Sequence, residues 1–147
     1  MAKFEIAETL SNNVDKKEIV LPRRATEYSA GYDLRTPIEI ELPAHTRVLV
    51  PTGVTCKLDI DEYLQIVPRS GLALKRGITV LNTPGTIDAD YYPNEIGVIL
   101  FNTTDTDLVI QKGERIAQAI LQTYGIMEDD APVERKREGG FGSTGRS

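Results

Sequence analysis

The 147-residue chain is acidic, with 17 lysines and arginines against 22 aspartates and glutamates and a formal net charge of −5. This balance argues against a general nucleic-acid-binding protein, which needs a basic face to displace the counterions of phosphates. No apolar run approaches the roughly 20 residues that span a bilayer, and the first residues lack the apolar stretch of a secretory signal. Cys56 is the only cysteine and His45 the only histidine, so neither an internal disulfide nor a Cys/His zinc site is expected. We expect one cytoplasmic domain that binds neither membranes nor nucleic acid.

The dominant hydrophobic period along the chain is two, which is typical of half-buried β-strands. In chain order the expected strands are Ile38–Leu42, Val48–Val50, Val54–Leu58, Tyr63–Val67, Ile96–Phe101, Leu108–Ile110 and Arg115–Ile120. Turn residues separate them, among them Pro51–Gly53 and Lys112–Gly113. Many short strands at intervals of roughly 8–12 residues predict an all-β sandwich or barrel.

One segment, Ser70–Gly77, breaks this alternation and predicts a short helix. Ser70 is a favourable N-cap, and Gly77 is suited to end the helix. At its start, Pro68–Gly71 combines a cation, a hydroxyl and exposed backbone N–H groups, which together suit an anion. An ordinary helix cap with a solvated Arg69 explains the same residues at least as well.

The alternating pattern ends near residue 127, which divides the chain into a β domain at 1–127 and a C-terminal arm at 128–147. The arm has acidic residues, then basic ones, then the glycine-rich run Gly139–Gly145 around Phe141. This composition has little capacity to pack by itself. We expect the arm to be flexible when nothing is bound. An aromatic side chain among glycines also suits an arm that folds over a ligand and stacks on it.

The segment Asn82–Tyr91 contains an amide, hydroxyls, two carboxylates and a phenol, with Pro84 and Gly85 bending the chain. If the stretch is extended, Asp88 and Asp90 share one face. A carboxylate near a bound phosphate is suited to act as a general base on water. An acidic turn with Asx capping is the competing interpretation.

Asp33 stands between apolar residues in Ala30–Leu34. Its carboxylate would suit a hydrated Mg²⁺, which usually keeps several waters and is shared with substrate phosphates. A plain aspartate at a strand edge is the simpler interpretation of this segment alone.

Taken together, these segments point to one protein family much more specifically than any of them does alone. They closely resemble, in order, the five motifs of the trimeric dUTP diphosphatases (dUTPases), over most of the chain from about residue 30 to 145. The matching segments are Ala30–Leu34, Pro68–Ala73, Gly85–Tyr91, Gly113–Gln118 and Gly139–Gly145. The resemblance implies a jelly-roll-like β fold, a homotrimer with shared active sites, and Mg²⁺-dependent hydrolysis of dUTP to dUMP and pyrophosphate. Such an activity keeps uracil out of DNA and supplies dUMP for thymidylate synthesis.

The resemblance also implies roles for individual residues. Asp88 would be the general base for the water that attacks the α-phosphate, and Tyr91 would lie under the deoxyribose and leave no room for a 2′-hydroxyl. Asn82 would pair with the edge of uracil, helped by backbone groups near Gly97. Phe141 would stack on the base, a contact worth on the order of 1 kcal/mol between aromatic rings.

The remaining implied contacts concern the phosphates, the metal and the pocket walls. Asp33 would act on Mg²⁺ through water rather than as a direct ligand. The phosphate-binding residues would be Arg69, Ser70, Gly71, Gln118 and Arg137, and Gly85, Thr86, Ile87 and Gly142 would complete the substrate site.

Two departures from the family pattern affect this transfer. After Tyr91 the family usually has Arg-Gly-Glu, whereas this chain has Tyr92–Glu95, which is one residue longer. In the arm, the usual arginine position holds Lys136, flanked by Arg135 and Arg137. We favour Arg137 as the phosphate ligand because a guanidinium binds phosphate with two hydrogen bonds.

Two other functions are compatible with these motifs. One is a dCTP deaminase of the same fold, which would release ammonia from dCTP. The sequence of Gly85–Tyr91 and the glycine-rich arm favour dUTPase over this alternative. A dUTP-responsive regulator, such as a phage-encoded dUTPase-like protein that binds a repressor, would keep every motif.

Overall fold

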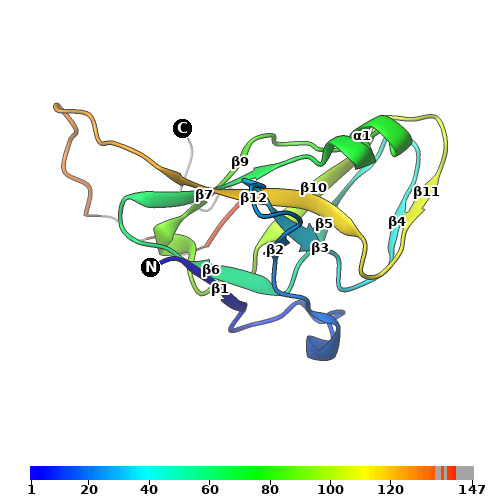
Figure 1. The fold of residues 1–147 in the computed structure, drawn as a ribbon, viewed down its shortest axis with the longest axis horizontal. Helices are drawn as coiled ribbons and strands as arrows, with labels where there is room; N and C mark the ends of the chain where they lie inside the picture. Colours follow the sequence, from blue (N-terminus) through cyan, green and yellow to red (C-terminus); the bar gives the residue numbers. More distant parts are fainter. Residues whose placement is uncertain (135–136, 138, 142–147) are drawn as a thin grey trace.

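The structure is a computed structural model that describes residues 1–134, 137 and 139–141. Short strands dominate it, and the one α-helix of the described residues is α1 (Figure 1). The strands are β1 (Lys3–Ile6), β2 (Arg23–Arg24), β3 (Tyr32–Arg35), β4 (Ile40–Leu42), β5 (Arg47–Pro51), β6 (Val54–Lys57), β7 (Glu62–Val67), β8 (Ile78–Val80), β9 (Gly85–Asp88), β10 (Gly97–Asn102), β11 (Leu108–Ile110) and β12 (Arg115–Thr123), with α1 at Ser70–Arg76 and the short 3-10 helices η1 (Lys16–Glu18) and η2 (Ala89–Tyr91). The predicted all-β class is confirmed.

The strands pair antiparallel in four sheets. The largest has the order β2-β3-β12-β7-β9, the next is β5-β10-β8, and two pairs, β1-β6 and β11-β4, complete the fold (Figure 1). The pairing does not close into a barrel over the described residues, so the sandwich half of the prediction holds and the barrel half is wrong. The physical reason is that each sheet keeps its own edge strands, such as β9 and β2.

One hydrophobic core joins the two larger sheets. It takes Leu34 from β3, Ile66 from β7 and Ala119 from β12 on one side, and Val98 and Leu100 from β10 on the other. In β10 buried and half-buried residues alternate, as a strand with one face on a core requires. The alternation here lies in burial and not in residue type, because Val98, Ile99, Leu100 and Phe101 are all apolar.

The helix α1 forms where expected, but its start differs from the prediction. Arg69, with extended backbone angles, is the N-cap residue, and Ser70 is the first helical residue, so the predicted Ser70 cap is wrong. Gly77 ends the helix at φ 64°, and its N–H donates to the Ala73 carbonyl at 3.0 Å. This left-handed conformation costs a glycine little, which explains the residue type.

The segment that carries the two candidate acids is only partly extended. The strand β9 ends at Asp88, and η2 begins at Ala89, so Asp90 is not on the same extended face as Asp88. The expectation of one extended face is therefore wrong. Asp88 instead marks the end of an edge strand, opposite Tyr63 of β7.

No helix in the described part of the chain is both long enough and apolar enough to cross a membrane. The lone cysteine, Cys56, is a free thiol buried on β6, where it pairs with Phe4 of β1.

Burial, followed by the negative charges of Glu62 and Glu5, raises the pKa of Cys56 from its ordinary 9.0 to about 11. Between these values the unfolded chain loses the thiol proton while the folded chain keeps it, so the stability contribution is complete below pH 9 and disappears as the pH rises toward 11. We expect a loss of about 3 kcal/mol in the free energy of unfolding across this window. Urea unfolding at fixed protein concentration between pH 8 and 11 measures it.

Cys56→Ala provides the control, because it lacks the thiol. The comparison concerns how stability changes with pH in each protein and not their absolute stabilities. The variant should lose less stability than the native chain over the same window. Parallel curves for the two proteins would show that the thiol does not titrate in this way.

Candidate functional site

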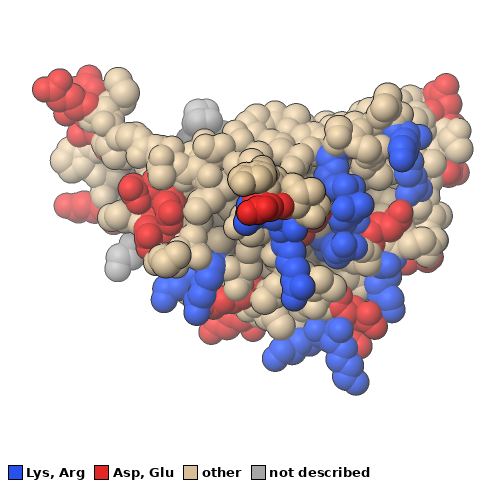
Figure 2. Space-filling model, in the orientation of Figure 1, with Lys and Arg blue, Asp and Glu red and all other residues tan. Residues whose placement is uncertain are grey.

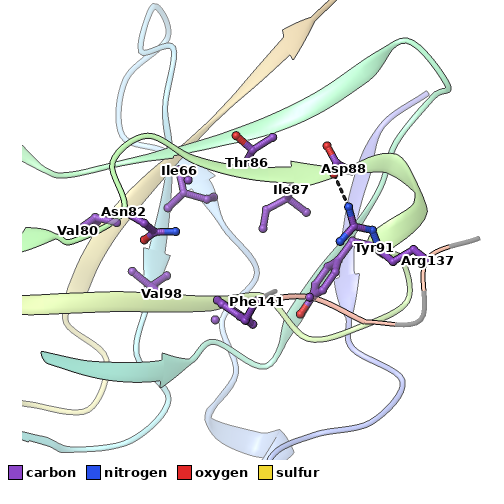
Figure 3. Close-up of a pocket in the computed structure, with 13 residues that line it drawn as sticks. Ile66, Val80, Asn82, Thr86, Ile87, Asp88, Tyr91, Val98, Arg137 and Phe141 are labelled. Carbon is purple, nitrogen blue, oxygen red and sulfur yellow. Dashed lines mark hydrogen bonds and ion pairs between the residues drawn. The ribbon is translucent and has the colours of Figure 1, made fainter. Parts of the chain in front are cut away.

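A cavity of about 150 Å³ lies between the end of β9 and the start of β10 (Figure 3). Most of the predicted substrate-binding residues meet there. Those that line it are Asn82, Gly85, Thr86, Ile87, Asp88, Tyr91, Gly97, Arg137 and Phe141. We call this cavity the Asp88 pocket. It combines an apolar wall with an amide, a carboxylate and aromatic rings, which is the usual composition of a small-molecule site.

Two glycines make room in this pocket. A Cβ atom on Gly97 would lie 2.7 Å from Leu49 Cδ1 and 3.3 Å from Phe141 Cζ. A Cβ atom on Gly85 would lie 3.3 Å from Cβ of Ile66. Glycine at both positions therefore keeps the backbone accessible beside Asn82, where a planar base would need hydrogen-bonding groups.

Tyr91 is held in place by its neighbours. Its side chain is buried, and its hydroxyl donates to the Glu95 carbonyl at 2.6 Å. Burial, followed by the nearby Glu95 charge, raises the pKa of the Tyr91 hydroxyl, so it stays a neutral donor at physiological pH. Gly140 of the arm packs against the ring, since a Cβ there would lie 2.7 Å from Tyr91 Cε1. The ring therefore presents a fixed flat surface to the pocket.

Glu95 is a functional residue that the sequence did not reveal. One carboxylate oxygen accepts from the Ser11 hydroxyl at 2.6 Å, and the other accepts from Gly53 N–H at 2.9 Å. Glu95 thus anchors the lengthened Tyr92–Glu95 turn to two remote segments. Its partners lie 84 and 42 residues away, and no local signal in the sequence connects them.

Arg137 reaches the Asp88 pocket from the arm and contacts carboxylates there. It forms an ion pair with Asp88 (Figure 3). Its Nε also lies 2.6 Å from Oδ1 of Asp90. Only 14% of its side chain is exposed. The carboxylates of Asp88 and Asp90 are 49% and 62% exposed, so water still screens both pairs. The alternatives Arg135 and Lys136, and the predicted site residue Gly142, lie outside the described residues.

A second group of predicted residues gathers elsewhere on the chain. Arg69 and Gly71 line an open groove of about 540 Å³ beside α1, which we call the Arg69 groove. Its lining shares no residue with the Asp88 pocket. Figure 2 shows lysine and arginine side chains gathered on the face that carries α1. The groove also has Arg35, Lys75, Arg76, Lys112 and Arg115 in its walls.

Asp33 and Gln118 lie directly behind this groove. Asp33 accepts a hydrogen bond from Arg69 Nε at 3.1 Å, and its other oxygen is 3.5 Å from Arg115 Nη1. Gln118 donates from Nε2 to the Pro68 carbonyl at 3.0 Å. Arg115 is a second residue that sequence reasoning missed, although it stands inside the matched segment Gly113–Gln118.

No group of three or more histidine, cysteine, aspartate or glutamate side chains is placed to hold a metal among the described residues. Asp33 is the residue that was expected to contact Mg²⁺ through water. Each of its carboxylate oxygens already faces an arginine. It is therefore a poor direct ligand for a divalent cation.

A β-sandwich with the Asp88 pocket and a separate arginine-rich groove has the features expected of a protein for small anionic ligands. The dUTPase family model matches residues 17–145. A deoxyuridine 5′-triphosphate nucleotidohydrolase of Treponema denticola is 46% identical over 136 residues, which cover 88% of this chain and 94% of that protein.

Solved structures agree. A Streptococcus mutans dUTPase has a TM-score of 0.75 at 34% identity and covers 85% of this chain and 98% of its own. The dUTPase of Staphylococcus aureus phage phi11, for which coordination of a structural Mg(II) ion is described, shares the fold with a TM-score of 0.72 at 19% identity, covering 92% of this chain and 97% of its own. The chain belongs to the dUTPase family of nucleotide-hydrolysing enzymes.

The hydrogen bond from Tyr91 to Glu95 should contribute measurably to stability. Tyr91→Phe keeps the ring but leaves a partly buried carbonyl without its donor, which should lower the free energy of unfolding by about 1 kcal/mol. Tyr28→Phe is the matched control, since its side chain is 91% exposed, and should change stability by less than about 0.5 kcal/mol. Denaturant unfolding of both variants makes the comparison, and equal effects would contradict the role of this bond.

Proposed function

We propose that the chain hydrolyses dUTP to dUMP and pyrophosphate in its Asp88 pocket. The observation that carries the proposal is the convergence of Asp88, Asn82 and Tyr91 on one cavity, together with Phe141 from the arm. The curated relatives, named as deoxyuridine 5′-triphosphate nucleotidohydrolases, support dUTP as the substrate rather than dCTP.

Base and sugar recognition follow from the pocket walls. The Asn82 amide offers a donor and an acceptor, which match the alternating edge of uracil. The fixed Tyr91 ring occupies the space that a 2′-hydroxyl would need, so the site selects a deoxyribose. Phe141, 59% exposed in this structure, is available to stack on the base.

Asp88 carries the chemistry in this proposal. It accepts a proton from a water, whose oxygen then attacks the α-phosphorus. The bond from the α-phosphorus to the oxygen shared with the β-phosphorus breaks, so that dUMP and pyrophosphate leave, and Asp88 later returns the proton to solvent. In the structure, Arg137 pairs with Asp88 and Asp90. A bound triphosphate competes for this guanidinium, and its transfer to the phosphates frees Asp88 to act as the base.

The separation of the Arg69 groove, which would bind phosphates, from the Asp88 pocket supports a homotrimer. A single chain holds the Asp88 pocket and the Arg69 groove as separate cavities. In a trimer, the Arg69, Ser70 and Gly71 of one subunit complete the pocket of another, as the family resemblance implies. We also place the activity in the cytoplasm, because the lone Cys56 is a free thiol.

We propose Mg²⁺ as the cofactor, held mainly by the substrate phosphates and by water. Bound in that way, it would supply positive charge that offsets the charge of the phosphates. The ion described for a variant of the phi11 enzyme is a structural Mg(II) ion, and it supports only the binding of Mg²⁺ by this fold. Any contact of the ion with Asp33 would pass through a water molecule, since arginines already face both carboxylate oxygens.

The first experiment measures pyrophosphate release from dUTP with Mg²⁺, and its absence in the native protein would remove the proposal. Asp88→Asn should then lower kcat by about 10²–10⁴-fold, the usual span for a general base, with little change in dUTP binding. Asp90→Asn is the matched control, because it also removes a carboxylate from Arg137 but not the proposed base. We expect it to lose less than about tenfold. Full activity in Asp88→Asn would contradict the mechanism.

Truncation after Asp130 tests the arm. The shortened chain lacks Arg137, Gly140 and Phe141, which cover the Asp88 pocket, so most dUTP hydrolysis should be lost. The assembly should keep the mass of three chains, each about 16.3 kDa before truncation, in light scattering. A monomer in the full-length protein would contradict the trimer, whereas a truncated trimer with full activity would contradict the role of the arm.

A further inference from the structure

The sheet brings Asp33, Gln118 and Val67 into one row. In the antiparallel register, Gln118 of β12 is paired with Asp33 of β3 on one side and with Val67 of β7 on the other. Directly paired residues of neighbouring strands point to the same face of a sheet. Pro68 and Arg69 follow Val67 at once, so the backbone that enters α1 passes beside both polar side chains.

Asp33 controls the direction of the Arg69 side chain. It holds Nε at 3.1 Å, and the two side chains are only 15% and 23% exposed. Among the described residues Arg69 makes no other side-chain hydrogen bond, so both terminal nitrogens remain available. A guanidinium fixed through Nε presents its outer edge in one orientation, which suits two-point binding of a phosphate.

Gln118 fixes the backbone at the same place. Its side-chain nitrogen donates to the Pro68 carbonyl at 3.0 Å. Gly31 makes this possible, since a Cβ there would lie 2.1 Å from Gln118 Oε1. Two side chains of the sheet therefore fix Arg69. Gln118 holds the Pro68 carbonyl that precedes it, and Asp33 holds its guanidinium.

The charges around Asp33 do not favour a metal. Arg69 and Arg115 both face its carboxylate, and two guanidinium groups repel a divalent cation. Mg²⁺ also prefers carboxylates that have free oxygens and space for its waters.

We infer that Asp33 is a positioning residue for Arg69: together with Gln118, it orients the guanidinium toward the β- and γ-phosphates of the nucleotide. Arg115 supplies the second positive charge that keeps the carboxylate in place. This inference rests on the proposed dUTP hydrolysis for its substrate, and it assigns Asp33 to the phosphates through an arginine rather than to the metal.

The test is a double-mutant cycle with Asp33→Ala, Arg69→Ala and the combined variant. Asp33→Ala should raise KM for dUTP about 10- to 100-fold with a smaller change in kcat, and the combined variant should be no worse than Arg69→Ala alone. Asp33→Asn keeps an oxygen acceptor for Arg69 Nε and should recover most of the loss. The Mg²⁺ concentration for half-maximal activity should stay within about twofold of the native value.

Calorimetric binding of pyrophosphate and of dUMP supplies a readout apart from turnover. Asp33→Ala should weaken pyrophosphate binding and leave dUMP binding unchanged, because dUMP lacks the phosphates that Arg69 would hold. Asp105→Ala is the matched control, an aspartate paired with His45 at a 98% exposed surface position, and should change neither.

Three results would overturn the inference: independent, multiplicative losses in the cycle, a raised Mg²⁺ requirement in Asp33→Ala, or unchanged pyrophosphate binding in that variant. If Asp33→Ala fails to fold, Asp33→Ser takes its place in the cycle, because the shorter hydroxyl side chain removes the carboxylate that holds Arg69 Nε. A native protein that binds pyrophosphate but does not hydrolyse dUTP would instead defeat the proposed function, and the binding comparison would remain valid.

Discussion

The pairing of β7 with its two neighbours is the constraint on which the rest of the structure depends. The last residue of β7, Val67, lies two positions before Arg69. Tyr63, near the start of β7, is paired with Asp88 of β9. Four steps of extended chain cover about 14 Å. The ladder therefore holds Arg69 and the candidate base apart, at opposite ends of one strand. This separation is the reason for proposing that a nucleotide would draw the two groups from two copies of the chain.

Carboxylate–arginine pairs organise each half of the site in this acidic chain. Arg137 bridges Asp88 and Asp90 in the pocket, and Asp33 lies between Arg69 and Arg115 behind the groove. Such pairs hold charged side chains in one geometry before the ligand arrives, and leaving one partner alone is costly when it is partly buried. A triphosphate can replace a carboxylate as the partner of an arginine without leaving that cation unpaired.

Local patterns predicted the helix and the strands β4 to β7 and β10 to β12, because these patterns depend on near neighbours. The strands β1, β2, β3, β8 and β9 were not among the expected ones. The predictions failed where a tertiary contact decided the conformation. Arg69 stays extended as its side chain pairs with Asp33, so the helix begins at Ser70 and not one residue later. The chain leaves β9 at Asp88 and turns through η2, which buries Tyr91 and brings its hydroxyl to Glu95.

The sequence by itself determined the β class, the helix α1 and the five motif segments, since alternation, turn residues and motif sequences are all local properties. The tertiary structure alone decided which charges meet. The Asp33–Arg69 contact joins residues 36 positions apart and the Asp88–Arg137 contact residues 49 apart. Strand register and the path of the arm create these pairs, and both depend on the packing of the whole chain rather than on the residues that meet.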